Sequence, residues 1–190
     1  MILIFSDIHA DREAAHFIES IASDFDEIYC CGDVCGYGRD FRYVIDMFKN
    51  LNIRSVLGNH DYAILHPMGL IDYPERVVEP ILWTIERMNS EEMDYIESLP
   101  LQIDTDSGIC IRHTVPDDGY VHSIEDCKPL LSLTDKKIIC IGHTHMYEEF
   151  KVGDKLIVNA GSISKGRGNS SPGYLVIDNG TVEHRLRKEV

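Results

Sequence analysis

The sequence has no apolar run long enough to span a bilayer, and no basic residues precede its first apolar stretch as they would in a secretory signal peptide. It has no internal repeats and no low-complexity tract. The first five residues run directly into Ser6-Asp7, which favours a strand followed by a loop. These absences argue against a membrane-bound or secreted protein, so we expect a cytoplasmic one without a membrane partner.

Positive charge is also scarce, because 18 Lys and Arg stand against 32 Asp and Glu, for a formal net charge of −14. A protein that binds long nucleic acid needs a continuous positive track, so this balance argues against one. A small anionic substrate is still compatible with it. Bound divalent metal ions would make one site locally positive inside a negative protein.

Six cysteines occur among 190 residues, but nothing else indicates the secreted context in which a disulfide framework forms. Cys30 and Cys31 are adjacent on an expected strand, where neighbouring side chains point to opposite faces. We interpret both as small core residues rather than metal ligands, and Cys110 and Cys140 likewise. A chain of this length is predicted to form a single domain over residues 1–190.

The N-terminal part alternates strand and helix patterns. Strands are expected at residues 1–5, 27–31 and 53–57, and apolar residues recur at helical spacing between 14 and 25 and between 41 and 51. Such a β-α-β-α-β run predicts parallel strands with right-handed crossovers. Residues 62–100 then favour helices, with an apolar stripe over 78–88 and a capping box, Asn89 to Glu92, opening a second helix.

After Pro100 the chain reads mostly as strand. Strands are expected at residues 101–104, 109–113, 137–141, 147–152, 156–159, 174–178 and 181–187, with a helix at 123–131. Gly153-Asp154 and Asn179-Gly180 are hairpin turn signals, so the last four strands should pair antiparallel. This order predicts an α/β fold in which two mixed β-sheets pack face to face between helices, as a four-layer αββα sandwich.

Side chains that bind metals follow the expected strands at five places. These are Asp7-Ile8-His9, Gly32-Asp33, Gly58-Asn59-His60-Asp61, His113 and Gly142-His143-Thr144-His145. In an open α/β sheet the carboxyl ends of the strands face one crevice, so these residues can converge. Five of the nine histidines lie in these motifs. We interpret the other four as structural: His16, His66, His122 and His184.

Imidazole nitrogens with Asp and Asn oxygens, and no thiolate, suit manganese, iron, cobalt, nickel or zinc better than magnesium or calcium. Seven such ligands can hold two ions if one carboxylate bridges them. A water bridging two ions becomes hydroxide near neutral pH and can attack phosphorus in line. An acid must then protonate the leaving oxygen, and His60, beside Asn59 but not needed as a ligand, is the candidate.

These motifs, followed by Asn159-Ala160-Gly161-Ser162, resemble those of the calcineurin-like metallophosphoesterases over nearly the whole chain. The likeness is greatest to the small bacterial and archaeal phosphodiesterase-like branch. It implies a first metal held by Asp7, His9, Asp33 and His145, and a second held by Asp33, Asn59, His113 and His143. It also implies His60 as the catalytic histidine, two divalent ions with manganese the most usual, and hydrolysis of a small phosphomonoester or phosphodiester.

Three positions depart from the family pattern. Thr114 stands where a Gly often follows the histidine, and would narrow the approach of the backbone to a phosphate. Ala10-Asp11 replaces a common Gly-Asn, and we interpret Asp11 as a helix cap rather than a substrate contact. Ala160 replaces a Pro without an expected effect.

Two other functions fit part of this pattern. A scaffold that binds protein partners, as the phosphoesterase-like subunit of retromer does, would resemble these enzymes, but retention of His60 argues against it. A nuclease acting on long DNA would share the metals but conflicts with the negative charge.

Several substrates, several metals, and either a monomer or a homo-oligomer are compatible with the sequence. Tyr37, His122, Lys165 and Arg167 are expected near the mouth of the site, the last two on a Gly- and Ser-rich loop over residues 164–172. Arg167 could be a phosphate clamp or a solvated loop residue.

Overall fold

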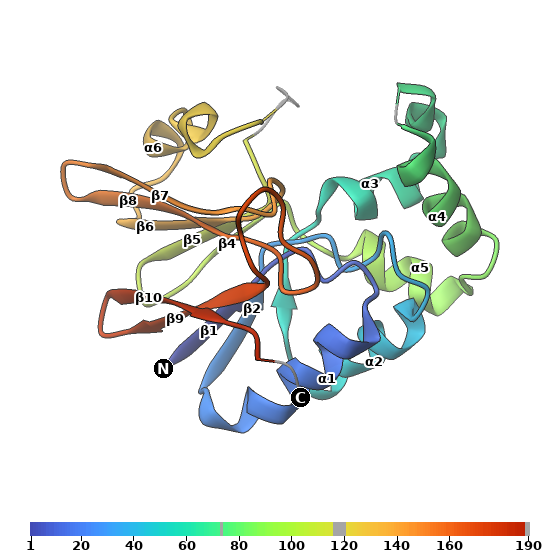
Figure 1. Ribbon diagram of the computed structural model, residues 1–190, viewed down its shortest axis with the longest axis horizontal. Coiled ribbons are helices and arrows are strands. Elements are labelled where there is room, and N and C mark those ends of the chain that lie inside the picture. The colour runs from blue at the N-terminus through green and yellow to red at the C-terminus, as the bar shows by residue number, and fades with distance from the viewer. Residues whose placement is uncertain (73, 116–120, 189–190) are drawn as a thin grey trace.

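The computed structural model describes residues 1–72, 74–115 and 121–188. Two five-stranded mixed sheets face each other, with a large helical layer outside one and a small one outside the other (Figure 1). The predicted four-layer sandwich of two mixed sheets is therefore confirmed. In the described parts of the chain, no helix is long and apolar enough to cross a membrane.

The first sheet has the strand order β10-β9-β1-β2-β3. Its strands are β1 (Ile2–Phe5), β2 (Glu27–Cys30), β3 (Arg54–Ser55), β9 (Gly173–Asp178) and β10 (Thr181–Leu186). β1, β2 and β3 run parallel, while β9 pairs antiparallel with both β1 and β10. The connections are α1 (Arg12–Ile21) with a short turn η1 (Ala22–Asp24), and α2 (Phe41–Asn50), as the helical spacing predicts.

The second sheet has the order β4-β5-β6-β8-β7. Its strands are β4 (Gln102–Asp104), β5 (Ile109–Arg112), β6 (Ile138–Ile141), β7 (Tyr147–Val152) and β8 (Lys155–Ala160). The central β5, β6 and β8 are parallel, and the two edge strands pair antiparallel. Its outer face is covered by η3 (Ile124–Cys127) and α6 (Leu130–Leu133).

Four further helical segments connect the two sheets and add to the helical layer of the first. They are α3 (Asn59–Leu65), η2 (Pro67–Asp72), α4 (Glu75–Ile85) and α5 (Ser90–Glu97). The predicted capping box is present at α5, where Asn89 accepts from the Glu92 N–H at 2.9 Å and the Glu92 carboxylate accepts from the Asn89 N–H at 2.8 Å.

Apolar side chains that alternate in direction along the strands cover both faces of the first sheet. Leu3 and Phe5 belong to the core under the helices, whereas Ile2 and Ile4 belong to the core between the sheets. Cys30 and Cys31 divide in the same way. All six cysteines are buried and free, as expected of core residues.

Some elements differ from the sequence prediction. The last four strands do form two antiparallel hairpins, but each hairpin belongs to a different sheet. The helix expected at 123–131 is broken into η3 and α6 at Pro129, which lacks the N–H that would continue the first segment. The strand expected at 53–57 is short because the Leu57 N–H turns to the carbonyl of Pro100 at 2.8 Å.

Candidate metal centre

Five of the candidate metal ligands, all in loops that follow strands, have a backbone in the left-handed region. Their φ angles are 54° at Asp7, 50° at His9, 56° at Asp33, 76° at His143 and 61° at His145. Such backbone costs about 1–3 kcal/mol per residue and persists only where surrounding contacts fix it. Here the loops bond to each other, since the N–H of Asp7 donates to Gly32 O at 3.0 Å and that of His9 to Asp33 O at 2.9 Å.

One group of side chains gathers around Asp7. Its Oδ1 atom lies 3.3 Å from Nε2 of His145 and 3.8 Å from Nε2 of His9. The two imidazole nitrogens are 2.9 Å apart. All three residues are buried, and their ligand atoms are close enough together to hold one metal ion.

A second group gathers around Asn59, at the start of α3. Its Oδ1 atom lies 2.8 Å from Nδ1 of His143 and 3.0 Å from Nε2 of His113. Asp33 lies between the two groups, because its Oδ2 is 3.5 Å from Nε2 of His113 and 3.7 Å from Nε2 of His9. The fold thus brings together all seven side chains that the sequence marks as metal ligands.

Backbone carbonyls orient three of the imidazoles. The bonds run from His9 Nδ1 to Cys35 O at 3.3 Å, from His113 Nδ1 to Cys31 O at 2.7 Å and from His145 Nδ1 to Lys165 O at 3.0 Å. A carbonyl can only accept, so each Nδ1 carries a proton, and in the neutral form of each ring Nε2 turns its lone pair inward. This second layer of contacts is typical of metal-ligating histidines.

The donor set fits divalent cations. With these tautomers, Nε2 of His9 faces Nε2 of His145, and Nε2 of His113 faces the amide oxygen of Asn59, so acceptors meet acceptors at 2.9 and 3.0 Å. Oδ1 of Asp7 is buried and receives no hydrogen bond from the described residues. Acceptors that face each other repel unless a cation lies against them, and these donors are nitrogen and oxygen ligands of the kind that transition metals bind.

Burial also sets the charge of these side chains. It lowers the pKa of His9 well below its ordinary value and that of His143 to about 4, so both rings are neutral at pH 7 and free to bind metal. Burial, together with the charges of Asp7 and Asp61, raises the pKa of Asp33. Bound cations would reverse that balance, because an opposite charge favours the carboxylate.

His60 also lies near Asp33, with its Nε2 4.0 Å from Asp33 Oδ2. Its ring centroid is 4.6 Å from that of His9, and its buried Nδ1 has no hydrogen-bond partner among the described residues. Burial lowers the pKa of His60 to about 3, and a positive charge on His113 would act in the same direction. His60, His9 and Asp33 could also hold an ion by distance alone, so a ligand role and an acid role both fit the geometry.

Asp61 is a site residue to which the sequence analysis assigns no role. Its buried carboxylate accepts backbone N–H bonds from Val34 at 3.1 Å, Cys35 at 2.9 Å and Gly58 at 3.1 Å. It thereby ties the loop that carries Asp33 to the first turn of α3, which carries Asn59 and His60. Its position in the first helical turn after Gly58 is the sequence signal that indicates such a role, because a carboxylate there can accept bonds from free backbone N–H groups.

Asp61→Asn should lower the free energy of unfolding by about 1–3 kcal/mol, because the amide's own NH₂ would face one of the three N–H donors and leave it unpaired. Urea denaturation of the metal-free protein measures this. Asp46→Asn, an exposed site on α2, is the matched control and should change stability by less than about 0.5 kcal/mol. Equal stability of the two variants would mean that Asp61 does not hold these loops.

The motif Asn159-Ala160-Gly161-Ser162 contributes no candidate metal ligand, but it holds the loops that carry the ligands. The Asn159 amide donates to Gly142 O at 2.7 Å and to Thr144 Oγ1 at 3.0 Å, which fixes the loop of His143 and His145. The Ser162 hydroxyl donates to the carbonyl of Asp7 at 2.8 Å. Both residues therefore hold ligand-bearing loops in place.

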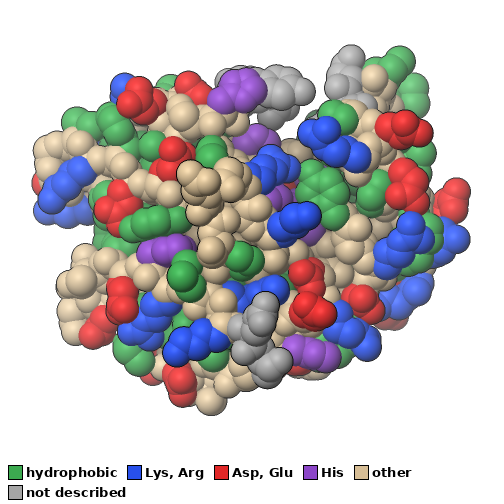
Figure 2. Space-filling model, viewed as in Figure 1, with side chains coloured by type: hydrophobic (Ala, Val, Ile, Leu, Met, Phe, Trp, Pro, Cys, Tyr) green, Lys and Arg blue, Asp and Glu red, His purple; other side chains and the backbone are tan. Residues whose placement is uncertain are grey.

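Asp11 caps α1, as predicted. Its carboxylate accepts from the N–H groups of Glu13 at 2.9 Å and Ala14 at 3.2 Å, and from the Ser164 hydroxyl at 2.5 Å. His122 lies two residues before η3, and its N–H donates to Asp126 at 2.9 Å. On the face seen in Figure 2, histidine side chains lie in a hollow near the middle of the molecule, with Lys and Arg side chains at its edge.

The other histidines lie outside the groups of possible metal ligands found among the described residues. Three of them contact a tyrosine ring, and the centroid separations are 5.2 Å for His16 and Tyr43, 4.3 Å for His66 and Tyr62, and 3.9 Å for His184 and Tyr147. These contacts agree with the structural role that the sequence predicts for them.

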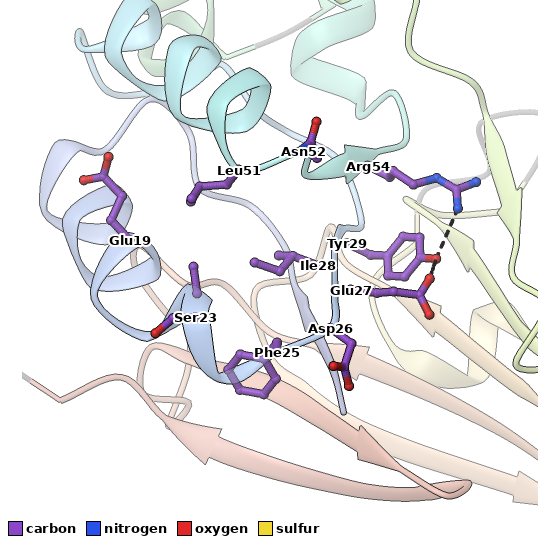
Figure 3. Close-up of a pocket in the computed structure, with 11 residues that line it drawn as sticks. Glu19, Ser23, Phe25, Asp26, Glu27, Ile28, Tyr29, Leu51, Asn52 and Arg54 are labelled. Atoms are coloured by element: carbon purple, nitrogen blue, oxygen red, sulfur yellow. Dashed lines mark hydrogen bonds between the residues drawn. The ribbon is translucent and has the colours of Figure 1, made fainter.

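A pocket of about 430 Å³ opens at the other end of the parallel strands, near the start of β2 and β3 (Figure 3). Its polar side includes Arg54, which donates to the Tyr29 hydroxyl at 3.2 Å, and Tyr29 donates in turn to Glu27. No histidine lines it. The pocket is therefore separate from the candidate metal centre.

Comparisons with known proteins agree with this geometry. The calcineurin-like phosphoesterase superfamily domain matches residues 1–181. The uncharacterized protein MJ0912 of Methanocaldococcus jannaschii is 26% identical over 202 residues, covering 94% of this chain and 82% of the relative.

Two crystal structures share the fold over 100% of this chain. A metallophosphoesterase from Sphaerobacter thermophilus matches over 88% of its length with a TM-score of 0.82 and 24% identity. The hypothetical protein PH1004 from Pyrococcus horikoshii OT3 matches over 89% of its length with a TM-score of 0.85 and 16% identity. The ordered motifs, the two facing sheets and the match to residues 1–181 place the chain in the calcineurin-like phosphoesterase superfamily.

Proposed function

We propose that this protein is a binuclear metal-dependent phosphoesterase that hydrolyses a small phosphomonoester or phosphodiester. The observation that carries the proposal is the facing of acceptor atoms at two places, His9 against His145 at 2.9 Å and His113 against Asn59 at 3.0 Å, with Asp33 between them. Two cations would relieve both contacts, and the carboxylate of Asp33 lies within reach of both.

The ligands divide between two ions. The first would be held by Asp7, His9, Asp33 and His145, and the second by Asp33, Asn59, His113 and His143. Nitrogen and oxygen donors without thiolate suit Mn²⁺, Fe, Co²⁺, Ni²⁺ or Zn²⁺, and the resemblance to the family makes Mn²⁺ the first choice among them. When bound, such ions supply charge stabilisation for a phosphate and lower the pKa of water to about 7.

The protein's own residues position and protonate the substrate. His60 lies beside Asp33 on the first turn of α3, and no hydrogen bond from the described residues holds its Nδ1. We assign it to protonate the leaving oxygen. Because burial lowers its pKa to about 3 in the unliganded protein, this role requires the bound phosphate, whose negative charge favours the imidazolium form.

Stripping the protein with a chelator and restoring one metal at a time tests the proposal. We expect hydrolysis of para-nitrophenyl phosphate, of bis(para-nitrophenyl) phosphate or of both to return with Mn²⁺, and the ratio of the two rates distinguishes a monoesterase from a diesterase. Protein that binds two ions per chain yet hydrolyses neither compound with any of the five metals would contradict the proposal and favour a scaffold.

A further inference from the structure

Arg167 lies at the edge of the candidate metal centre, on the loop that follows β8. Its backbone N–H donates to the carbonyl of His145 at 3.1 Å, and its own carbonyl accepts from Ser170 at 3.0 Å. Its guanidinium Nη2 donates to the Tyr37 hydroxyl at 3.1 Å. Hydrogen bonds thus hold the backbone of Arg167 in place, and Tyr37 on the loop after β2 orients its side chain.

Tyr37 is itself held against the metal centre. Its ring centroid lies 4.7 Å from that of His9 and 4.8 Å from that of His60. The loop backbone also touches His9 closely, since a Cβ on Gly36 would lie 2.1 Å from Nδ1 of His9. Tyr37 therefore sets the guanidinium of Arg167 on the side of the centre where His9 and His60 lie, and His60 is the residue assigned to the leaving oxygen.

The charge of Arg167 is available to a ligand. The chain has 32 acidic residues, yet Arg167 is exposed and pairs with no carboxylate in the parts that the structure describes. Its charge is close enough to act on Asp33, His60 and His143. The planar fork of a guanidinium matches the oxygens of a phosphate and forms charge-assisted hydrogen bonds with them.

We propose that Arg167 binds a second phosphate, carried by the leaving group, so that the substrate is a small bisphosphorylated compound. The inference rests on the proposed function. One water is consumed: its oxygen bonds to phosphorus, the bond from phosphorus to the leaving oxygen breaks, and that oxygen takes a proton from His60, which a proton of the water replaces. The products are orthophosphate and an alcohol that still carries the second phosphate, which Arg167 holds, while Tyr37 is the positioning residue that orients Arg167.

The alternative is that Arg167 and Tyr37 only fasten two loops together. A matched pair of probes separates these roles: adenosine 3′,5′-bisphosphate and adenosine 3′-monophosphate, which differ by one phosphate. Each is measured as a competitive inhibitor of para-nitrophenyl phosphate hydrolysis by the Mn²⁺-loaded protein. In a protein of net charge −14, extra negative charge on a ligand weakens binding unless a local cation receives it.

We expect the bisphosphate to bind the wild type about 10- to 100-fold more tightly than the monophosphate, the range for one charged hydrogen-bonding partner. Arg167→Gln should bring the ratio near 1, and Arg167→Lys should restore part of it. Tyr37→Phe should lower the ratio by a smaller factor and add nothing to Arg167→Gln. Lys151→Gln, which removes an exposed charge from β7, is the matched control and should leave the ratio unchanged.

Three outcomes would overturn the assignment of Arg167 in an active enzyme. The wild type could bind the two nucleotides equally well, or neither nucleotide could inhibit it. The preference for the bisphosphate could also persist in Arg167→Gln. Wild-type protein that hydrolyses no phosphoester with any metal would overturn the proposed function instead, and this inference with it.

Discussion

Asp33→Asn should reduce phosphoester hydrolysis by about 10³-fold or more, because the variant loses a carboxylate that lies within reach of both ligand groups and, with it, several kcal/mol of metal-dependent stabilisation. Asparagine suits the site otherwise. It tolerates the left-handed backbone of residue 33, at φ 56°, and its amide oxygen can still accept the His60 N–H that Asp33 Oδ1 receives at 2.9 Å. The loss would therefore report the charge and not a disturbed loop.

A stability measurement gives the same substitution a second readout. Burial and the charges of Asp7 and Asp61 raise the pKa of Asp33, so its ionised form destabilises the metal-free protein at neutral pH, and this cost disappears as the pH falls below that raised pKa. In the presence of a chelator at pH 7, Asp33→Asn should unfold at a higher urea concentration than the wild type. With Mn²⁺ added the order should reverse, because only the wild type gains from binding both ions.

An Asp33→Asn variant that keeps wild-type turnover would remove Asp33 from the centre. A lower urea midpoint than the wild type in chelator would mean that the variant has lost structure, and its inactivity would then carry no information about charge.

His60→Ala should lower turnover of para-nitrophenyl phosphate by about 10²- to 10⁴-fold, the range for loss of a general acid, while two ions remain bound. The loss should be smaller for 2,4-dinitrophenyl phosphate, because its better leaving group needs less protonation. In the wild type, kcat should fall as the pH rises through the pKa of His60 in the substrate complex, and the variant should lack that limb.

Metal content is the control for this variant, since His60, His9 and Asp33 could together hold an ion by distance. Loss of one ion from His60→Ala would assign His60 as a ligand and not as the acid. An equal loss of rate with both leaving groups would also contradict the acid role.

Much of this account could be predicted from the sequence, because strand ends, glycine turns and histidine pairs are local patterns. Asp7-x-His9 and Gly142-His143-x-His145 lie 130 residues or more apart, yet both follow short apolar runs, and that alone placed them at one edge of the fold. The two core faces of β1 follow from the period of a strand, and the cap at Asp11 from its place before α1.

Other features depend on contacts between distant segments. The two C-terminal hairpins have similar patterns, and only the pairing of β9 with β1 assigns them to different sheets. The sequence places Asp61 in the first turn of a helix. Its bonds to Val34 and Cys35, however, form only when the loop after β2 folds against α3. The contact of Arg167 with Tyr37 joins residues 130 positions apart, so no local pattern could choose between a clamp and a solvated loop.

The most direct test of the two-ion centre is anomalous scattering from a crystal of the Mn²⁺-loaded protein. We expect two peaks about 3.5–4 Å apart with Asp33 between them, one beside Asp7, His9 and His145 and the other beside Asn59, His113 and His143. A single peak, or two peaks that Asp33 does not join, would contradict the account.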